Sequence, residues 1–179
     1  METYPSKNIA ISWIEEGSLI RNVFLSLGFA IMTALSAQIR IEIPISPVPI
    51  TAQTFVVLLA GLLLGSTFGA LSMLMYLFLG MSGLPFFSGS VSGLAILKSP
   101  TIGYIIGFFI ASYLVGRFST KPIMGITLGT LVIYVCGVFG LQIILNTTIS
   151  NAITIGVLPF LVGDLIKCFL ASAIAYKLK

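Results

Sequence analysis

Long apolar segments with few charged residues are the feature that most restricts what this chain can fold into. Six such segments occur, at residues 19–39, 50–64, 68–81, 102–115, 123–145 and 153–176. None alternates apolar and polar residues, as the strands of a membrane barrel do. Because a helix crosses a bilayer with about 20 mostly apolar residues, the sequence predicts an all-α membrane protein with six transmembrane helices, whose ends can shift by a few residues.

Charge is scarce enough to exclude most classes of soluble protein. The chain has 179 residues, of which nine are Lys or Arg and five are Asp or Glu, so 8% are charged. Soluble domains carry about 25% charged residues. Hydrophobic residues make up 58% of the chain, and its mean hydropathy is +1.14. This composition excludes a soluble enzyme, a nucleic-acid binder and a disordered tail.

Residue types that carry catalysis are also missing from the sequence. There is no His and a single Asp, which removes a Ser–His dyad, a zinc metallopeptidase and a pair of aspartates. No G-x-x-x-x-G-K-[ST] loop is present to hold ATP phosphates. Cys136 and Cys168 lie far apart in apolar segments, where we interpret them as packing residues. The chain is therefore predicted not to be an enzyme and to use no metal or cofactor.

The distribution of basic residues predicts how the helices are oriented. With six spans, both termini and two of the connections share one side of the membrane. That side holds Lys7, Arg21, Arg117, Lys121, Lys177 and Lys179, and the other side holds Arg40 and Lys98. Loops rich in Lys and Arg face the cytoplasm, so both termini are expected there. We predict a cytoplasmic or interfacial segment at residues 1–18 and a six-helix substrate-binding domain in the cell membrane at residues 19–179.

Two long connections are predicted on the outer side. Residues 40–51 contain Pro44, Pro47 and Pro49, which prevent a helix and favour an extended, stiff segment. Residues 82–100 are rich in Gly, Ser and aromatic side chains, which are costly in water unless they fold back on something. We interpret both loops as lids over the outer end of the bundle. The alternative is that their aromatic residues rest among lipid headgroups.

Asp164 and Lys167 are the most informative polar residues, because they lie near the middle of the sixth apolar segment. Each alone would cost at least ~2.5–3.5 kcal/mol on insertion scales. Their i,i+3 spacing places both on one face of a helix, where they partly neutralise each other. Such a pair can serve architecture alone. It can also form a site with one acceptor and one donor, suited to a small polar ring that carries N–H and C=O groups.

Other polar and small residues extend this pattern. Gln53, Tyr104, Asn146 and Asn151 fall toward the predicted outer side, where each could contact a ligand or only cap a helix. Ser26, Ala30 and Ala34 repeat at i, i+4 and i+8, which makes a smooth stripe for close helix approach. Such a stripe serves either internal packing or an external partner.

Five short motifs follow one another along the chain: Pro47-Val-Pro-Ile-Thr-Ala-Gln-Thr54, Leu-Leu-Ala-Gly61, Gly83-Leu-Pro-Phe86, Gly103-Tyr-Ile-Ile-Gly-Phe108 and Gly163-Asp-x-x-Lys167. In this order they resemble the BioY family, the biotin-specific S-components of energy-coupling factor (ECF) transporters. The resemblance covers about residues 20–178.

The resemblance implies a six-helix bundle that captures biotin from outside with high affinity. It also implies assembly with a transmembrane coupling subunit (T-component) and two ABC-type ATPases, which agrees with the missing phosphate loop. The family's docking motif on the first helix falls on Ala30 and Ala34. Its acidic and basic pair falls on Asp164 and Lys167.

Biotin suits these residues chemically. We expect Asp164 to accept a ureido N–H and Lys167 to donate to the ureido oxygen, through charge-assisted bonds. The apolar ring would rest against Tyr104, Phe86 and Phe87, and the tail would reach Ser90, Ser92 or Lys98. In the opposite orientation, Lys167 would bind the carboxylate.

The residues themselves are also compatible with three other functions. One is an S-component for another vitamin, such as thiamine or riboflavin. Another is a self-sufficient proton-coupled carrier that uses Asp164. A third is a membrane assembly factor that uses the stripe of Ser26, Ala30 and Ala34.

Overall fold

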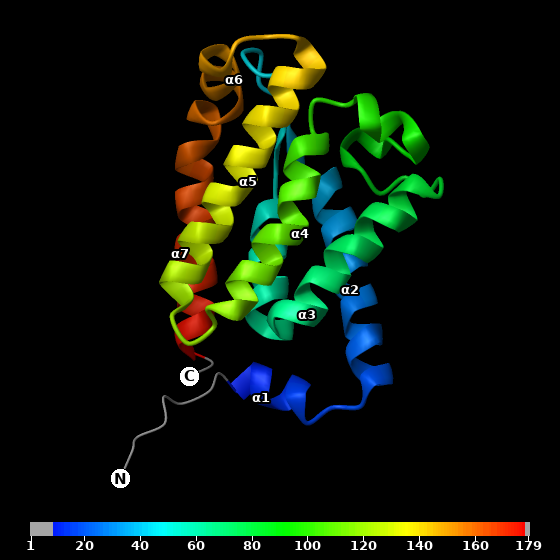
Figure 1. Cartoon of the computed structure of the whole chain (residues 1–179), viewed down its shortest axis with the longest axis vertical. Coiled ribbons are helices and arrows are strands. Elements are labelled where there is room, and N and C mark those ends of the chain that lie inside the picture. Colours follow the sequence, from blue (N-terminus) through cyan, green and yellow to red (C-terminus); the bar gives the residue numbers. More distant parts are fainter. Residues whose placement is uncertain (1–8, 178–179) are drawn as a thin grey trace.

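Apolar helices lie side by side along the long axis of the molecule, and the longer loops gather at one end (Figure 1). The structure is a computed structural model that describes residues 9–177. In chain order the elements are α1 (Ile9–Glu15), α2 (Leu19–Gln38), β1 (Arg40–Ile41), β2 (Ile50–Thr51), α3 (Gln53–Met81), η1 (Ser88–Ser90), η2 (Gly93–Lys98), α4 (Ile102–Arg117), α5 (Pro122–Leu145), α6 (Ile149–Gly156), η3 (Leu158–Phe160) and α7 (Leu161–Lys177). Residues 1–8 of the predicted N-terminal segment, with Lys7, and also Lys179 lie outside the described residues.

The helical membrane class is confirmed, and three predicted spans match single helices. α2, α4 and α5 begin and end within two residues of the first, fourth and fifth apolar segments. Four helical stretches are long and apolar enough to cross a membrane, at Leu19–Gln38, Gln53–Met81, Pro122–Leu145 and Ile149–Lys177. The 16 residues of α4 make a shorter apolar helix beside them. The chain is therefore an integral membrane protein.

The second and third predicted spans are the two halves of α3, which are separated by a sharp kink where the two apolar segments were predicted to part. α3 runs for 29 residues, and its helical geometry is interrupted at Gly65, with φ +74° and ψ −174°. Glycine adopts a positive φ at little cost because it has no side chain. The two halves of α3 consequently run in different directions (Figure 1).

The sixth predicted span is broken a few residues before its charged pair, which corrects its continuity as one helix. α6 ends at Gly156, the short turn η3 contains Pro159, and α7 begins at Leu161. Proline has no N–H to continue a helix. Asp164 therefore lies in the first turn of α7 rather than in mid-helix. The dipole of a helix favours negative charge at this end.

Both long loops fold back on the bundle. The first is extended, as its prolines predict, and its ends pair as antiparallel strands, with Arg40 opposite Thr51. In the second, Phe87 is fully buried with its ring edge-on to Tyr76, at 5.5 Å between centroids. Gln38 of α2 donates a hydrogen bond to the Phe87 carbonyl at 3.1 Å. The end of the bundle that carries these loops is called the loop end below.

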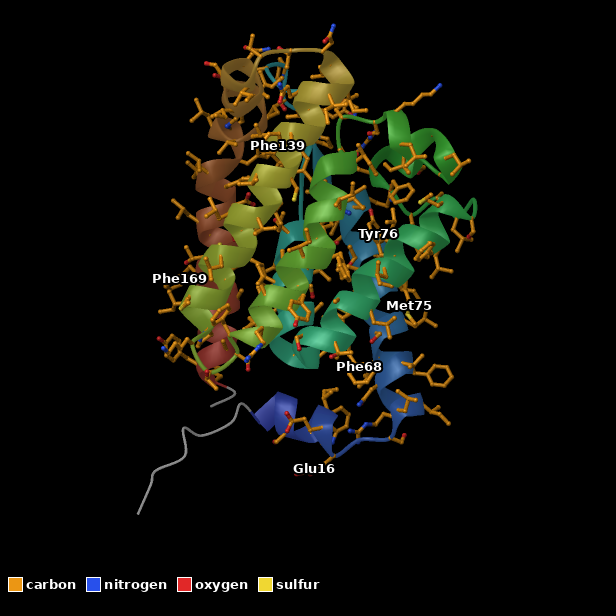
Figure 2. All side chains as sticks on the ribbon, in the orientation of Figure 1. Glu16, Phe68, Met75, Tyr76, Phe139 and Phe169 are labelled. Atoms are coloured by element: carbon orange, nitrogen blue, oxygen red, sulfur yellow. The ribbon has the colours of Figure 1, made fainter. Side chains whose placement is uncertain are left out.

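Many large apolar side chains lie on the outer faces of the helices. Figure 2 shows side chains projecting outward along the bundle, and Phe169 of α7 is 73% exposed. Phe24 of α2 and Phe139 of α5 are also exposed. Soluble monomers rarely expose apolar surface on this scale. These faces suit contact with lipid tails.

The small-residue stripe of α2 lies inside the bundle. Ala30 and Ala34 belong to the buried core, and the Ser26 hydroxyl donates to the Phe68 carbonyl of α3 at 3.0 Å. Both alanines are buried in this conformation, and their predicted docking role stays a prediction. The arrangement agrees with the internal-packing alternative.

Close contact between α4 and α5 depends on two glycines. A Cβ added at Gly140 would lie 2.6 Å from the Gly103 Cα, closer than real Cβ atoms approach. Gly140→Ala should therefore lower the free energy of unfolding by about 1–3 kcal/mol, because the two backbones must separate. The midpoint of thermal unfolding in detergent measures this effect.

Gly28→Ala is the matched control, since a Cβ there meets nothing within 4 Å. It should leave the midpoint unchanged or raise it, because alanine favours the helix over glycine. Equal midpoints for the two variants would contradict the packing role of Gly140.

Candidate ligand-binding site

The predicted charged pair forms in the structure. Lys167 Nζ lies 2.8 Å from Asp164 Oδ1, and the two side chains are 17% and 8% exposed. One turn of α7 separates the residues, so the i,i+3 spacing brings both to the same face, as predicted. A nearly buried ion pair is stable only when its remaining hydrogen-bonding groups are also satisfied.

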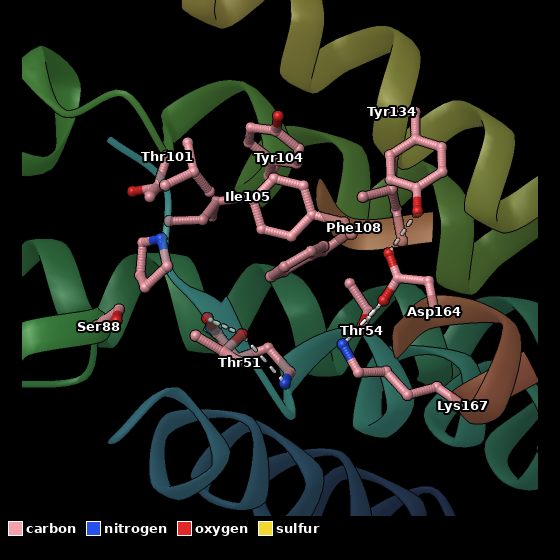
Figure 3. A pocket seen from close by; sticks show the side chains of 15 residues that line it. Thr51, Thr54, Ser88, Thr101, Tyr104, Ile105, Phe108, Tyr134, Asp164 and Lys167 are labelled. Carbon is pink, nitrogen blue, oxygen red and sulfur yellow. Dashed lines mark hydrogen bonds and ion pairs between the residues drawn. The ribbon is translucent and has the colours of Figure 1, made fainter. Parts of the chain in front are cut away.

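Thr54 and Tyr134 supply those remaining bonds (Figure 3). The Thr54 hydroxyl donates to Asp164 Oδ1 at 3.1 Å and accepts from Lys167 Nζ at 3.0 Å. The Tyr134 hydroxyl donates to Asp164 Oδ2 at 2.6 Å. Three helices, α3, α5 and α7, therefore meet at one carboxylate. Asp164, Lys167, Thr54 and Tyr134 are called the polar network below.

A cavity adjoins the polar network and makes it a candidate binding site. It holds about 560 Å³ of empty space, including the part that opens to the outside. Its lining consists of Val48, Pro49, Thr51, Gln53, Thr54, Ser88, Thr101, Tyr104, Ile105, Phe108, Ile133, Tyr134, Phe160, Asp164 and Lys167. We call this space the binding cavity.

Aromatic rings form much of the apolar wall. Tyr104, Phe108 and Phe160 line the cavity, and the centroids of the Tyr104 and Phe160 rings are 6.5 Å apart. The Tyr104 hydroxyl donates to the Gly156 carbonyl at 2.7 Å. This bond fixes the ring and satisfies a carbonyl at the end of α6. Tyr104 therefore forms part of the cavity wall, and its contact with a ligand stays a prediction.

Gln53 also lines the cavity, at the start of α3. Its Nε2 donates to the Tyr76 hydroxyl at 2.8 Å, and its Oε1 accepts from the Thr51 hydroxyl at 3.2 Å. The amide thus joins the first loop to the buried side of α3. This contact supports the cavity wall.

The other predicted contact residues do not line the cavity. Phe86 and Phe87 pack on Tyr76 and anchor the second loop. Asn151 is exposed, and its side-chain amide donates to the Thr147 hydroxyl at 2.8 Å, as in the capping alternative. Ser90 is exposed, and Ser92 precedes η2, so neither reaches the wall. The placement of these five residues is corrected.

Sequence reasoning missed both hydroxyl partners of the ion pair. Thr54 ends one of the family motifs, directly after Gln53, and Tyr134 is a polar residue within the apolar helix α5. The rule for buried ionisable groups in a membrane, that each has a partner facing inward, was the available signal. The rule does not say which hydroxyl groups contact the ion pair, because this depends on how each helix is rotated about its axis.

Taken together, the fold and the cavity define a class: a helical membrane protein with a solute-binding cavity. One carboxylate and one ammonium group lie side by side against aromatic rings. Such a site can accept a hydrogen bond from an N–H group and donate one to a carbonyl of a small, partly apolar molecule.

Comparison with known proteins identifies the family. The model of the BioY family matches residues 6–179, and the chain belongs to this family. A probable biotin transporter of Pyrococcus horikoshii is 40% identical over 161 residues, which cover 89% of this chain and 96% of that protein. A biotin transporter of Thermotoga maritima is 37% identical over 145 residues, which cover 78% of this chain and 85% of the relative.

A solved structure has the same fold. The crystal structure of the S-component for biotin from an ECF-type ABC transporter superposes with a TM-score of 0.80 and 26% identity. The match covers 89% of this chain and 90% of the solved one. The family and its relatives are named as transporters and not as enzymes.

The hydroxyl of Tyr134 is expected to stabilise the bundle through Asp164. Tyr134→Phe should lower the free energy of unfolding by about 1–3 kcal/mol, because a buried carboxylate oxygen loses its donor. Thermal unfolding of the ligand-free protein in detergent measures the change. Tyr113→Phe is the matched control, because Tyr113 is exposed on α4. Similar losses in both variants would contradict the role given to Tyr134.

Proposed function

We propose that this chain is the biotin-binding S-component of an ECF-type ABC vitamin importer in the cell membrane. It captures biotin with high affinity from the outer side, as cargo and not as a cofactor, and it is not an enzyme. The observation that carries the proposal is the buried Asp164–Lys167 pair, which lines a cavity together with aromatic side chains. Membership of the BioY family supports biotin as the ligand.

The ureido ring of biotin fits the polar network. Asp164 accepts a ureido N–H, and Lys167 donates to the ureido oxygen, as expected for charge-assisted bonds in a dry site. Tyr104, Phe108 and Phe160 offer rings to the apolar thiophane. The opposite orientation, with Lys167 on the carboxylate, is tested below.

The membrane arrangement follows from the charges and the bend of α3. Each half of α3 makes one pass, and α2, α4, α5 and the α6–α7 pair complete six. Arg40 and Lys98 belong to the loop end, whereas Arg21, Arg117, Lys121 and Lys177 belong to the opposite end. The positive-inside rule then supports cytoplasmic termini, with the two long loops as lids on the outer side.

We also propose that a transmembrane coupling subunit and two ABC-type ATPases drive release to the cytoplasm. The likeness to the solved S-component, which comes from an ECF-type ABC transporter, supports this. The docking role of Ala30 and Ala34 stays a prediction. Because both are buried against the bundle, docking there would require α2 to move from α3.

Equilibrium binding is the direct test of the ligand. Labelled biotin should bind the detergent-purified chain, and excess thiamine or riboflavin should not displace it. Displacement by either vitamin, with no effect of unlabelled biotin, would assign another cargo.

Asp164→Asn should weaken biotin binding. Breaking a buried pair costs about 3–5 kcal/mol in total, divided here between binding and stability. Thr127→Val in α5, which is exposed, serves as the control. Unchanged affinity of Asp164→Asn would remove Asp164 from the site.

Uptake into vesicles tests the partners. Biotin should accumulate only when the coupling subunit, the ATPases and ATP are present, because the chain has no phosphate-binding loop of its own. Uptake by this chain alone, driven by a pH gradient, would instead support a proton-coupled carrier that uses Asp164.

A further inference from the structure

A second hollow lies next to the binding cavity at the loop end. It holds about 960 Å³ of empty space, including its open part. Its lining consists of Arg40, Glu42, Ile43, Pro44, Ser46, Pro47, Pro49, Ser88, Ser99 and Thr101. Pro49, Ser88 and Thr101 line both spaces. The second hollow therefore adjoins the binding cavity, and we call it the vestibule.

Arg40 is the cation of this vestibule. It lies in β1 opposite Thr51, and Thr51 lines the binding cavity. The guanidinium also contacts the second loop, since a Cβ at Gly89 would lie 2.3 Å from Arg40 Nη1. Arg40 thus stands where the two loops meet, one strand away from the cavity wall.

The contacts of Arg40 leave it able to bind an anion. Its ion pair with Glu42, 3.2 Å long, joins side chains that are 41% and 74% exposed. Exposed pairs of this kind contribute little to stability. A guanidinium has five N–H donors in a planar fork, so a second carboxylate can bind beside Glu42 or replace it.

Ser88 provides an independent sign that a polar group is missing from this space. Its hydroxyl is buried, and it has no hydrogen-bond partner among the residues that the structure describes. Buried hydroxyls are almost always paired, so an unpaired one needs an explanation. Figure 3 shows Ser88 and Thr101 on the opposite side of the view from Asp164 and Lys167. A ligand whose ring lies on the polar network would extend its tail in that direction.

The binding cavity cannot by itself neutralise a ligand's negative charge. The charged residues of its lining are Asp164 and Lys167, and Lys167 is already bonded to Asp164 and Thr54. We propose that Arg40 and Ser88 bind the carboxylate tail of the ligand in the vestibule. This inference rests on the proposed biotin-binding function. Arg40 and Ser88 then take the place of Ser90, Ser92 and Lys98 as the expected partners of the tail.

The test compares biotin with its methyl ester, which has the same ring and an uncharged tail. Both compete with labelled biotin for the detergent-purified chain. Biotin should bind about tenfold more tightly than the ester, as expected for a hydrogen bond to a charged group. Arg40→Gln should weaken the binding of biotin by this factor and leave the binding of the ester unchanged. The ratio of the two affinities then falls to about one. Ester binding also reports that the variant is folded.

Two further variants complete the comparison. Lys98→Gln removes an exposed cation of the second loop that lines neither space, and it should keep the ratio of the unaltered protein. Ser88→Ala should lower the affinity for biotin by about threefold, since a neutral hydrogen-bond donor contributes less than a charged one.

The outcomes separate this inference from the proposed function. If neither biotin nor its ester binds the unaltered chain, both fail. If both ligands bind but Arg40→Gln keeps the ratio, only the role of Arg40 is wrong. Loss of the ratio in Lys167→Ala, with no change in Arg40→Gln, would place the carboxylate at Lys167 and overturn the inference.

Discussion

The arrangement of the helices around the cavity depends on one buried carboxylate. Removing the charges of Asp164 and Lys167 from water is costly, and their mutual attraction offsets this cost only with additional hydrogen bonds. Thr54 of α3 and Tyr134 of α5 supply those bonds to α7. A rotation of any of these three helices would leave a charge unsatisfied, so the polar network fixes their relative orientation as well as the chemistry of the site.

Glycine and aromatic residues position the rest of the wall around this network. Gly103 and Gly140 let α4 approach α5 closely. Tyr104, the residue after Gly103, lines the cavity. Packing between membrane helices depends on such close approach, because lipid tails are as apolar as the side chains. At the loop end, the burial of Phe87 holds the second loop against α3. The first loop is held through Gln53 and the paired strands.

Much of the fold was predictable from the sequence, because long apolar segments in a chain with 8% charge allow few other structures. The ion pair was predictable from its helical spacing. The kink at Gly65 falls where the second and third apolar segments were separated, whereas the break at Pro159 was missed because apolar composition continues across it. Thr54 and Tyr134 were missed because contacts between helices depend on rotation and tilt. Phe86 and Phe87 were misplaced because an aromatic side chain in a loop can anchor the loop as readily as contact a ligand.

The bond from Tyr104 to the Gly156 carbonyl has a consequence for the thermodynamics of recognition. It holds one of the two tyrosine rings of the cavity wall against a backbone group of α6 before any solute arrives. A preorganised surface loses little side-chain entropy when it is occupied. The entropic penalty of association then falls mainly on the flexible part of the incoming molecule, and stiffer analogues of that molecule would gain most.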